Sequence, residues 1–324
     1  MTGNATEEDQ SNAGARRARG EFVRGVSGFR HAIGDPDFPA EPGRYHLFVA
    51  LNCPWCHRVT LARAVLGLTD AISMDVAFPN RTGEDDPEGE GLWEFAPHRI
   101  ASLTGTPLPE CTAETATRRD LRLVRDIYAA EGSDETSVPI LYDKKAKRIV
   151  SNESAEIVRM LNRHAGPLGS SLARGDRPEL CPDALTDDIE RLNTEIYNDI
   201  NNGAYKAGFS SDQEVYAEAF GRYFDRLSRL EALLSSDGRP YLTGDTFTEA
   251  DLRLYPTLFR HDPVYYVRMK LNGARILDYP NLWRWLCRVH GLPGVAASGS
   301  LIHCRQAISA GHGTGWFLLA RCCP

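Results

Sequence analysis

The chain has 324 residues, of which 42% are hydrophobic and 25% charged, and its formal net charge at pH 7 is −7. This length and composition are typical of a globular protein with one large or two ordinary domains. The negative charge and the lack of a long basic block argue against nucleic-acid binding. No run reaches the roughly 18 apolar residues of a membrane helix and no secretory signal is present, so we expect no membrane association and a cytoplasmic location.

The first half of the chain predicts alternating strands and helices. Residues 1–20 are polar and aperiodic, which predicts a flexible tail. Residues 45–51 (YHLFVAL) predict a buried strand, residues 54–66 a helix that Gly67 ends, and residues 72–78 a second strand. These three elements form a βαβ unit.

The next stretch predicts a long loop and then a ββα unit. Residues 79–117 are rich in Gly, Pro, Asp and Glu, which favours an active-site cover or an insertion. After it the pattern predicts a helix over 121–130, strands over 138–143 and 148–151, and a helix over 153–162. The order βαβαββα is the thioredoxin-like arrangement, and we assign it to residues 21–165.

The second half predicts helices only. Residues 166–182 are typical of an interdomain connector, and residues 183–324 form the predicted all-helical domain. Its helices are expected over 183–201, 213–234, 248 to about 272, and 280–290. Thr248 and Asp251 have the spacing of a capping box, a structural role. The predicted fold is therefore α/β plus all-α.

Cys53 is the most informative residue, because it lies where the first strand turns into the first helix. Free backbone N–H groups and the helix dipole favour the thiolate there, and the thiolate is the nucleophilic form of cysteine. Pro54 suits the first helical turn, since its missing N–H would have no partner. A zinc site at Cys53 and Cys56 would need two more ligands, and no second Cys-x-x-Cys or paired His exists, so we expect no metal.

Pro139 follows Val138 at the start of the third strand. A cis Val138–Pro139 bond would expose the backbone of Val138 to whatever lies against Cys53, whereas an ordinary edge-strand proline has no such role. The sequence leaves both interpretations open.

Six stretches carry a resemblance to a known family: residues 43–47 (GRYHL), 53–58 (CPWCHR), 92–95 (LWEF), 138–145 (VPILYDKK), 151–157 (SNESAEI) and 200–209 (INNGAYKAGF). In this order they resemble the Xi-class glutathione transferases, the glutathionyl-hydroquinone reductases. The architecture that the resemblance implies is a thioredoxin-like domain followed by an all-helical domain. It also implies a homodimer built through the helical domains.

The activity that the resemblance implies is a two-step thiol exchange with glutathione as co-substrate. The Cys53 thiolate attacks the sulfur of a glutathionylated hydroquinone and forms a mixed disulfide with glutathione, and free glutathione then attacks that disulfide. A low thiol pKa suits both steps, because it raises the thiolate fraction and makes Cys53 a good leaving group.

The resemblance also implies roles for six further residues. Glu153 and Ser154 would hold the γ-glutamyl end of glutathione, Val138 beside Pro139 would bond its cysteinyl backbone, and Trp93 would pack over it. Tyr205 matches the family's active-site tyrosine, which would hydrogen-bond the oxygen of the aromatic substrate.

The chain departs from the family pattern at three places. Family members have Ala or Gly at the position of Cys56, so here a second thiol could resolve the mixed disulfide, or Cys56 could be a harmless small residue. Glu135 lies near the position of a family arginine, which makes a different thiol or weaker glutathione affinity possible. Residues 303–308 (HCRQAI) lack the family's second active-site tyrosine.

These departures keep two other functions open. Cys56 favours a glutaredoxin-like deglutathionylase that uses Cys53 and Cys56. The missing tyrosine favours a non-catalytic ligand-binding protein on a transferase fold.

Overall fold

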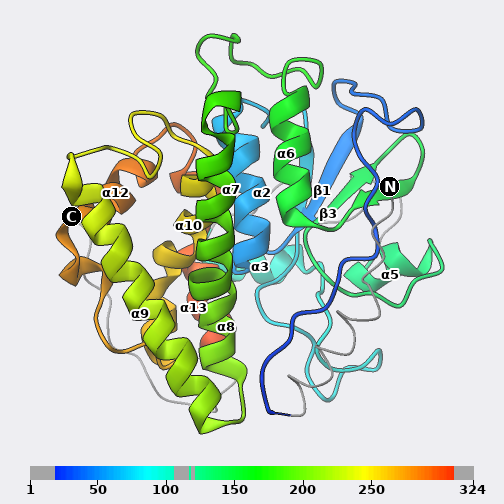
Figure 1. The fold of residues 1–324 in the computed structure, drawn as a ribbon. Coiled ribbons are helices and arrows are strands. Elements are labelled where there is room, and N and C mark those ends of the chain that lie inside the picture. Colours follow the sequence, from blue (N-terminus) through cyan, green and yellow to red (C-terminus); the bar gives the residue numbers. More distant parts are fainter. Residues whose placement is uncertain (1–18, 106–116, 118–120, 310–324) are drawn as a thin grey trace.

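A four-stranded mixed sheet forms the centre of the N-terminal half (Figure 1). The computed structural model describes residues 19–105, 117 and 121–309, so most of the predicted tail lies outside the described residues. The strand order is β2-β1-β3-β4, where β1 pairs parallel with β2 and β3 pairs antiparallel with both β1 and β4. The strands are β1 (Tyr45–Val49), β2 (Ser73–Val76), β3 (Ile140–Asp143) and β4 (Arg148–Ser151).

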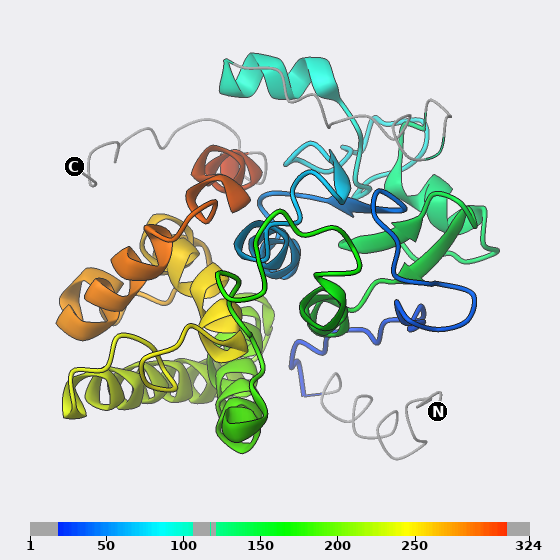
Figure 2. The ribbon, with the colours of Figure 1, turned by 90° about the horizontal axis from the view of Figure 1, so that it is seen from above.

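The helices α2 (Pro54–Val65) and α6 (Ser154–His164) lie side by side between the sheet and the helical half (Figure 2). This position explains why α2 is buried almost all round, and the left-handed Gly67 follows its end as predicted. Because β1 and β4 both run antiparallel to β3, α2 and α6 begin at the same edge of the sheet. Strand β3 starts at that edge too, since Ile140 pairs with Phe48 near the end of β1.

The second half is helical within the described residues, as predicted. The helix α10 packs against both α2 and α7, so it joins the two halves. The thioredoxin-like and helical halves follow in the expected order. The elements are η1 (Asp183–Leu185), α7 (Thr186–Ile196), η2 (Tyr197–Asn201), α8 (Asn202–Phe209), α9 (Gln213–Ser236), α10 (Glu249–Arg260), η3 (His261–Tyr265), α11 (Tyr266–Arg268), η4 (Ile276–Asp278), α12 (Pro280–His290), η5 (Ala296–Ser298) and α13 (Leu301–Ser309).

Asp251 caps α10 and is hydrogen-bonded on both carboxylate oxygens. Its Oδ2 accepts from the Thr248 N–H, and its Oδ1 accepts from the Leu242 N–H and the indole N–H of Trp285. Burial nevertheless raises the pKa of Asp251 to about 6. The predicted capping box is confirmed, and it also ties α10 to α12 through Trp285.

Several boundaries differ from the prediction. The segment predicted as a loop over 79–117 contains the helix α3 (Pro97–Thr104), whose only buried residue is Ile100, so the sequence carries no apolar stripe that would reveal it. The short helix α5 (Val124–Ala129) fills less than its predicted range.

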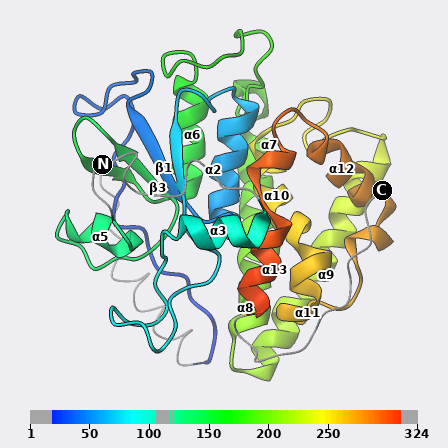
Figure 3. The same ribbon diagram turned by 180° about the vertical axis from the view of Figure 1, so that it is seen from behind.

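The predicted helix from residue 248 to about 272 ends at Arg268 and is a regular α-helix only as far as Arg260. There the chain enters the π-helical turn η3, and a second π-turn, η2, interrupts the other predicted helix before Asn202. The helix α13 packs against η3 on the face seen in Figure 3 and was not predicted.

Candidate active site

Cys53 is the N-cap residue of α2, with φ −80° and ψ 123°. The side chain is partly exposed, and its Sγ lies 3.9 Å from the Val138 carbonyl oxygen. The thiol of Cys56 lowers the pKa of Cys53 to about 6, helped by the N–H groups of Cys56 and Trp55 and by Arg260, against the opposing effect of burial. At neutral pH the sulfur is therefore mainly a thiolate.

Cys56 lies one turn into α2 and is fully buried. Its Sγ accepts a hydrogen bond of 3.3 Å from the Ala50 N–H. Burial and the neighbouring Cys53 sulfur raise the pKa of Cys56 well above its ordinary value. Cys56 therefore stays a thiol at neutral pH and presents an S–H donor to the Cys53 thiolate.

Arg260, the last residue of α10, supplies a buried positive charge that the sequence did not reveal. It is 1% exposed, and its guanidinium donates to the carbonyl oxygens of Leu51 (3.0 Å) and Asn52 (3.2 Å), at the turn that leads into Cys53. Among the described residues no carboxylate is found in an ion pair with Arg260, and its positive charge is one of the causes that lower the pKa of Cys53. Only the packing of α10 against α2 brings Arg260 there.

His57 accepts a hydrogen bond from the Arg260 guanidinium and helps to hold it in place. Burial and Arg260 lower the pKa of His57 well below its ordinary value, so the ring is neutral. Its Nδ1 lies 2.8 Å from Arg260 Nη1 and its Nε2 lies 3.0 Å from Ser298 Oγ. Because Arg260 can only donate, Nδ1 of His57 accepts its hydrogen bond. The ring proton is therefore on Nε2, and this N–H donates a hydrogen bond to Ser298 Oγ.

Tyr205 reaches the same region from α8. Its ring contacts Phe22, Trp55 and Phe209, with centroid distances of 5.8, 6.1 and 5.6 Å. Burial, followed by Tyr265 and Cys53, raises the pKa of Tyr205 well above its ordinary value. Its hydroxyl therefore remains a proton donor near the thiolate.

Val138 lies beside Cys53, and Trp93 lies beside Arg81, in the thioredoxin-like half. The Val138–Pro139 peptide bond is cis, which resolves the alternative that the sequence left open. Trp93 is 6% exposed, and the guanidinium of Arg81 lies 4.3 Å from its ring centroid. The predicted loop thus contributes the cation Arg81, which interacts electrostatically with Cys53 and lies over the Trp93 ring, and Arg81 was not among the predicted residues.

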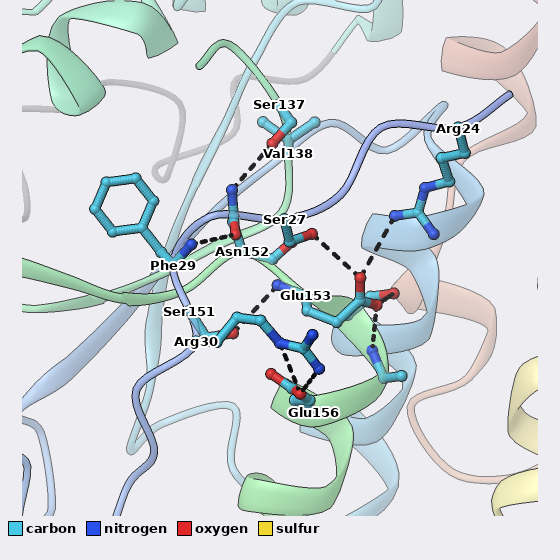
Figure 4. A network of polar contacts seen from close by, with 12 residues as sticks. Arg24, Ser27, Phe29, Arg30, Ser137, Val138, Ser151, Asn152, Glu153 and Glu156 are labelled. Atoms are coloured by element: carbon cyan, nitrogen blue, oxygen red, sulfur yellow. Dashed lines mark hydrogen bonds and ion pairs between the residues drawn. The ribbon is translucent and has the colours of Figure 1, made fainter. Parts of the chain in front are cut away.

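Glu153 is the N-cap residue of α6, and its carboxylate gathers several donors (Figure 4). It accepts from the Ala155 N–H (3.1 Å) and from Ser27 Oγ (3.2 Å), and Arg24 Nη2 lies 3.9 Å away. Burial raises the pKa of Glu153, but Arg24 and the Ala155 amide outweigh that effect and lower it overall, so the group is ionised. Ser154, the next residue, is fully buried with its Oγ 3.4 Å from Glu153 Oε1.

Glu135, which lies near the position of a family arginine, forms hydrogen bonds within the protein that the sequence did not predict. Its Oε1 accepts a hydrogen bond of 3.0 Å from the Gly28 N–H, and its Oε2 accepts from the Asn152 side-chain amide. Asn152 in turn accepts from the Phe29 N–H, which Figure 4 shows. Glu135 therefore fastens the N-terminal segment to the loop before α6.

Residues 303–308, where the sequence departs from the family pattern, all lie within α13. His303 and Cys304 are buried, and Cys304 Sγ lies 3.9 Å from the Leu51 carbonyl oxygen. The vicinal pair Cys322 and Cys323 lies outside the described residues.

Over residues 19–105, 117 and 121–309, no three His, Cys, Asp or Glu side chains are grouped as metal ligands would be. In that same part of the chain, every helix is too short or too polar to cross a membrane.

Known proteins of similar sequence and structure point to one family. The model for the glutathione S-transferase N-terminal domain matches residues 52–164, and that for the C-terminal domain matches residues 213–288. The glutathionyl-hydroquinone reductase YqjG of Escherichia coli (strain K12) is 38% identical over 305 residues, which cover 91% of this chain and 86% of YqjG.

Two solved structures have a closely similar fold. The glutathione-S-transferase Xi from Phanerochaete chrysosporium has a TM-score of 0.75 at 35% identity and covers 89% of this chain and 87% of its own. The glutathione-bound structure of E. coli YqjG has a TM-score of 0.73 at 36% identity and covers 89% and 88%.

Proposed function

The chain belongs to the Xi class of glutathione transferases, in the family of glutathionyl-hydroquinone reductase enzymes, and on this premise we propose that it reduces glutathionylated hydroquinones through Cys53. The observation that carries the proposal is the partly exposed thiolate of Cys53, whose pKa is about 6. Such a group is ionised at neutral pH and is also a good leaving group from a disulfide.

The reaction proceeds in two exchanges at the Cys53 sulfur. In the first, a new S–S bond forms between Cys53 and the glutathionyl sulfur while the ring carbon–sulfur bond breaks, and the ring carbon takes up a proton. In the second, a glutathione thiolate attacks the mixed disulfide and leaves as oxidised glutathione, which regenerates the Cys53 thiolate. The ring is reduced, and the glutathionyl group of the substrate and one free glutathione become one disulfide, so atoms and electrons balance.

Glutathione would lie along the edge of the sheet where α2, α6 and β3 begin. The ionised Glu153 suits the γ-glutamyl ammonium, and Ser154 at the start of α6 suits its carboxylate. The backbone of Val138, beside the cis Pro139, would hydrogen-bond the cysteinyl backbone of glutathione. Trp93 would pack over the tripeptide. The glutathione complex of the related YqjG supports this choice of co-substrate.

Tyr205 would contact the aromatic ring. Its hydroxyl is protonated, and it belongs to the helical half, opposite the edge proposed for glutathione. A hydrogen bond from Tyr205 to a ring oxygen would stabilise the charge that develops as the sulfur leaves.

The test offers glutathionyl-hydroquinone and free glutathione to the purified full chain and measures released hydroquinone and oxidised glutathione by chromatography. We expect turnover by the wild type and none by Cys53→Ser, with one oxidised glutathione formed per hydroquinone. Full activity of Cys53→Ser would refute the role of Cys53. Size-exclusion chromatography with light scattering tests the homodimer that we also propose.

A second function is favoured by the S–H group of Cys56 next to the Cys53 sulfur. In this dithiol alternative, Cys56 attacks the Cys53 mixed disulfide, and the chain deglutathionylates proteins or small disulfides. Offering a glutathione mixed disulfide beside glutathionyl-hydroquinone separates the two functions. Turnover of the disulfide alone would support the second.

A further inference from the structure

Arg81 is an exposed residue of the loop after β2, and in the described part of the chain no carboxylate is found in an ion pair with it. Its guanidinium donates to the Gly91 carbonyl oxygen (2.7 Å), lies over the Trp93 ring and interacts electrostatically with Cys53 and Tyr205. The other arginines that contact this loop each have an anionic partner: Arg99 pairs with Glu94, Arg122 with Asp86 and Arg125 with Glu88. Arg81 is therefore a cation that an anion near the thiol could bind.

The loop that carries Arg81 is held at the edge of the sheet where Cys53 lies. Strand β2 runs parallel to β1, so the two strands end at the same edge. The side-chain amide of Asn52 donates a hydrogen bond of 3.0 Å to the Pro79 carbonyl oxygen. This bond joins the residue before Cys53 to a residue two positions before Arg81, which fixes the cation beside the thiol.

The strand order gives glutathione a direction across this edge. The proposed function places its γ-glutamyl end at the start of α6, which follows β4, and its cysteinyl residue between β3 and Cys53, which follows β1. Because the order is β2-β1-β3-β4, the third residue of the tripeptide would then point towards β2. Strands lie about 4.8 Å apart, so the distance from β4 to β2 is about 14 Å, which an extended tripeptide of about 10 Å and an arginine side chain can span.

The charges of glutathione leave one group without a partner in the proposed site. At neutral pH the tripeptide carries one ammonium and two carboxylates. Glu153 suits the ammonium, and Ser154 at the start of α6 suits the γ-glutamyl carboxylate. Glu135 is an acidic group that accepts from the Gly28 N–H, so it does not suit a carboxylate. The glycyl carboxylate therefore still needs a cation.

We propose that Arg81 binds the glycyl carboxylate of glutathione. This inference rests on the proposed reductase function and names the group that recognises the third residue of its co-substrate. An arginine suits this role, because its planar guanidinium can stack on an indole ring while its N–H groups donate in pairs to a carboxylate. The contact between Arg81 and Trp93 thus holds the cation ready for the ligand.

Calorimetric titration of the purified full chain tests the proposal with glutathione and with its glycyl ethyl ester, which lacks the charge of that carboxylate. The wild type should bind the ester about ten- to a hundredfold more weakly than glutathione, because the ester loses charge-assisted hydrogen bonds. Arg81→Met should bind both ligands with the weaker affinity. Arg99→Met is the matched control and should bind glutathione normally, since Arg99 also stacks on a ring, that of Phe78, but is paired with Glu94.

Steady-state kinetics separate the two glutathione molecules of the reaction. Glutathionyl-hydroquinone carries the same glycyl carboxylate, so its kcat/KM should fall in Arg81→Met by a factor similar to the loss of affinity. The kcat/KM for free glutathione should stay near the wild-type value, because the glutathionyl group of the mixed disulfide already occupies Arg81. The reverse pattern would assign Arg81 to the attacking glutathione and would overturn the proposal.

The remaining outcomes are equally decisive. If Arg81→Met still prefers glutathione to the ester as strongly as the wild type does, the role of Arg81 is overturned, and an active wild type leaves the reductase function intact. An equal loss of affinity for both ligands shows that Arg81 supports the loop, and it also overturns the role. A wild type that binds glutathione but does not reduce glutathionyl-hydroquinone refutes the reductase function, while the titration still decides the role of Arg81.

Discussion

The substitution Cys56→Ala should raise the pKa of Cys53. The Cys56 thiol is the largest of the influences that favour the Cys53 thiolate, ahead of the backbone N–H groups and Arg260. Alanine removes the S–H donor but keeps the backbone N–H of residue 56 and the small volume of the side chain. The change therefore isolates one hydrogen bond.

The size of the effect follows from the strength of that bond. A hydrogen bond to a charged group contributes about 1.5–3 kcal/mol, which corresponds to about one to two pKa units. The pKa of Cys53 is about 6 in the wild type. In Cys56→Ala it should be about 7–8, so that the thiolate fraction at pH 7 falls from about nine tenths to about half or less.

The assay is the rate of alkylation by iodoacetamide between pH 4 and pH 10, with the Cys53 peptide quantified by mass spectrometry. Cys56→Ser is the matched variant, because its hydroxyl still donates a hydrogen bond but cannot form a disulfide. We expect the pKa of Cys53 in Cys56→Ser to lie between those of the wild type and Cys56→Ala.

An alkylation pKa of Cys56→Ala equal to that of the wild type would refute the reasoning. If, in addition, Cys56→Ala and Cys56→Ser lost the same share of turnover, Cys56 would act by resolving the mixed disulfide. Steady-state turnover at saturating glutathione therefore accompanies the alkylation measurement.

Three further predictions follow from the site and its support. Replacing Arg260 with Met should raise the pKa of Cys53 by about one unit, because the variant lacks the buried charge; an unshifted alkylation profile would contradict this. Glu153→Gln should weaken glutathione binding at least about tenfold by calorimetry, since the ammonium loses its anionic partner, whereas Glu156→Gln on the same helix should bind normally. Burial raises the pKa of Asp251 to about 6, so the stability that its protonated form contributes is complete below about pH 4 and lost as the pH rises through 6. The free energy of unfolding of the wild type minus that of Asp251→Asn should therefore fall by about 2–3 kcal/mol between pH 4 and pH 7 in urea titrations, and a constant difference would exclude this effect.

Local patterns in the sequence predicted the parts of the fold that depend on neighbouring residues. The thiol at the start of a helix, the Thr248–Asp251 cap and the order of the first strands all come from spacings of a few positions. The helix α3 was not predicted because only one of its side chains is buried, which gives no hydrophobic periodicity. The π-turns were not predicted because one added residue in a helical turn does not change the hydrophobic periodicity recognisably.

The missed site residues depend on contacts between distant segments. Arg260 lies more than two hundred positions from Leu51 and Asn52, whose carbonyl groups it binds, and its importance arises only where α10 meets α2. Glu135 is the opposite case. Its charge suggested a thiol other than glutathione or a weaker affinity for glutathione, but its hydrogen-bond partners are Gly28 and Asn152 of the protein itself. In both cases the packing, which no local pattern encodes, decides what the charge does.

The position of Arg260 means that the nucleophile and part of its activation are encoded in different halves of the chain. Cys53 begins α2, whereas the cation beneath it ends α10. An excised first half would keep its sulfur but lose that cation, and with it some of the acidity of the thiol. A chimera that exchanges the second half for that of a distant transferase would inherit the same deficit unless the donor supplied an arginine at the end of the corresponding helix.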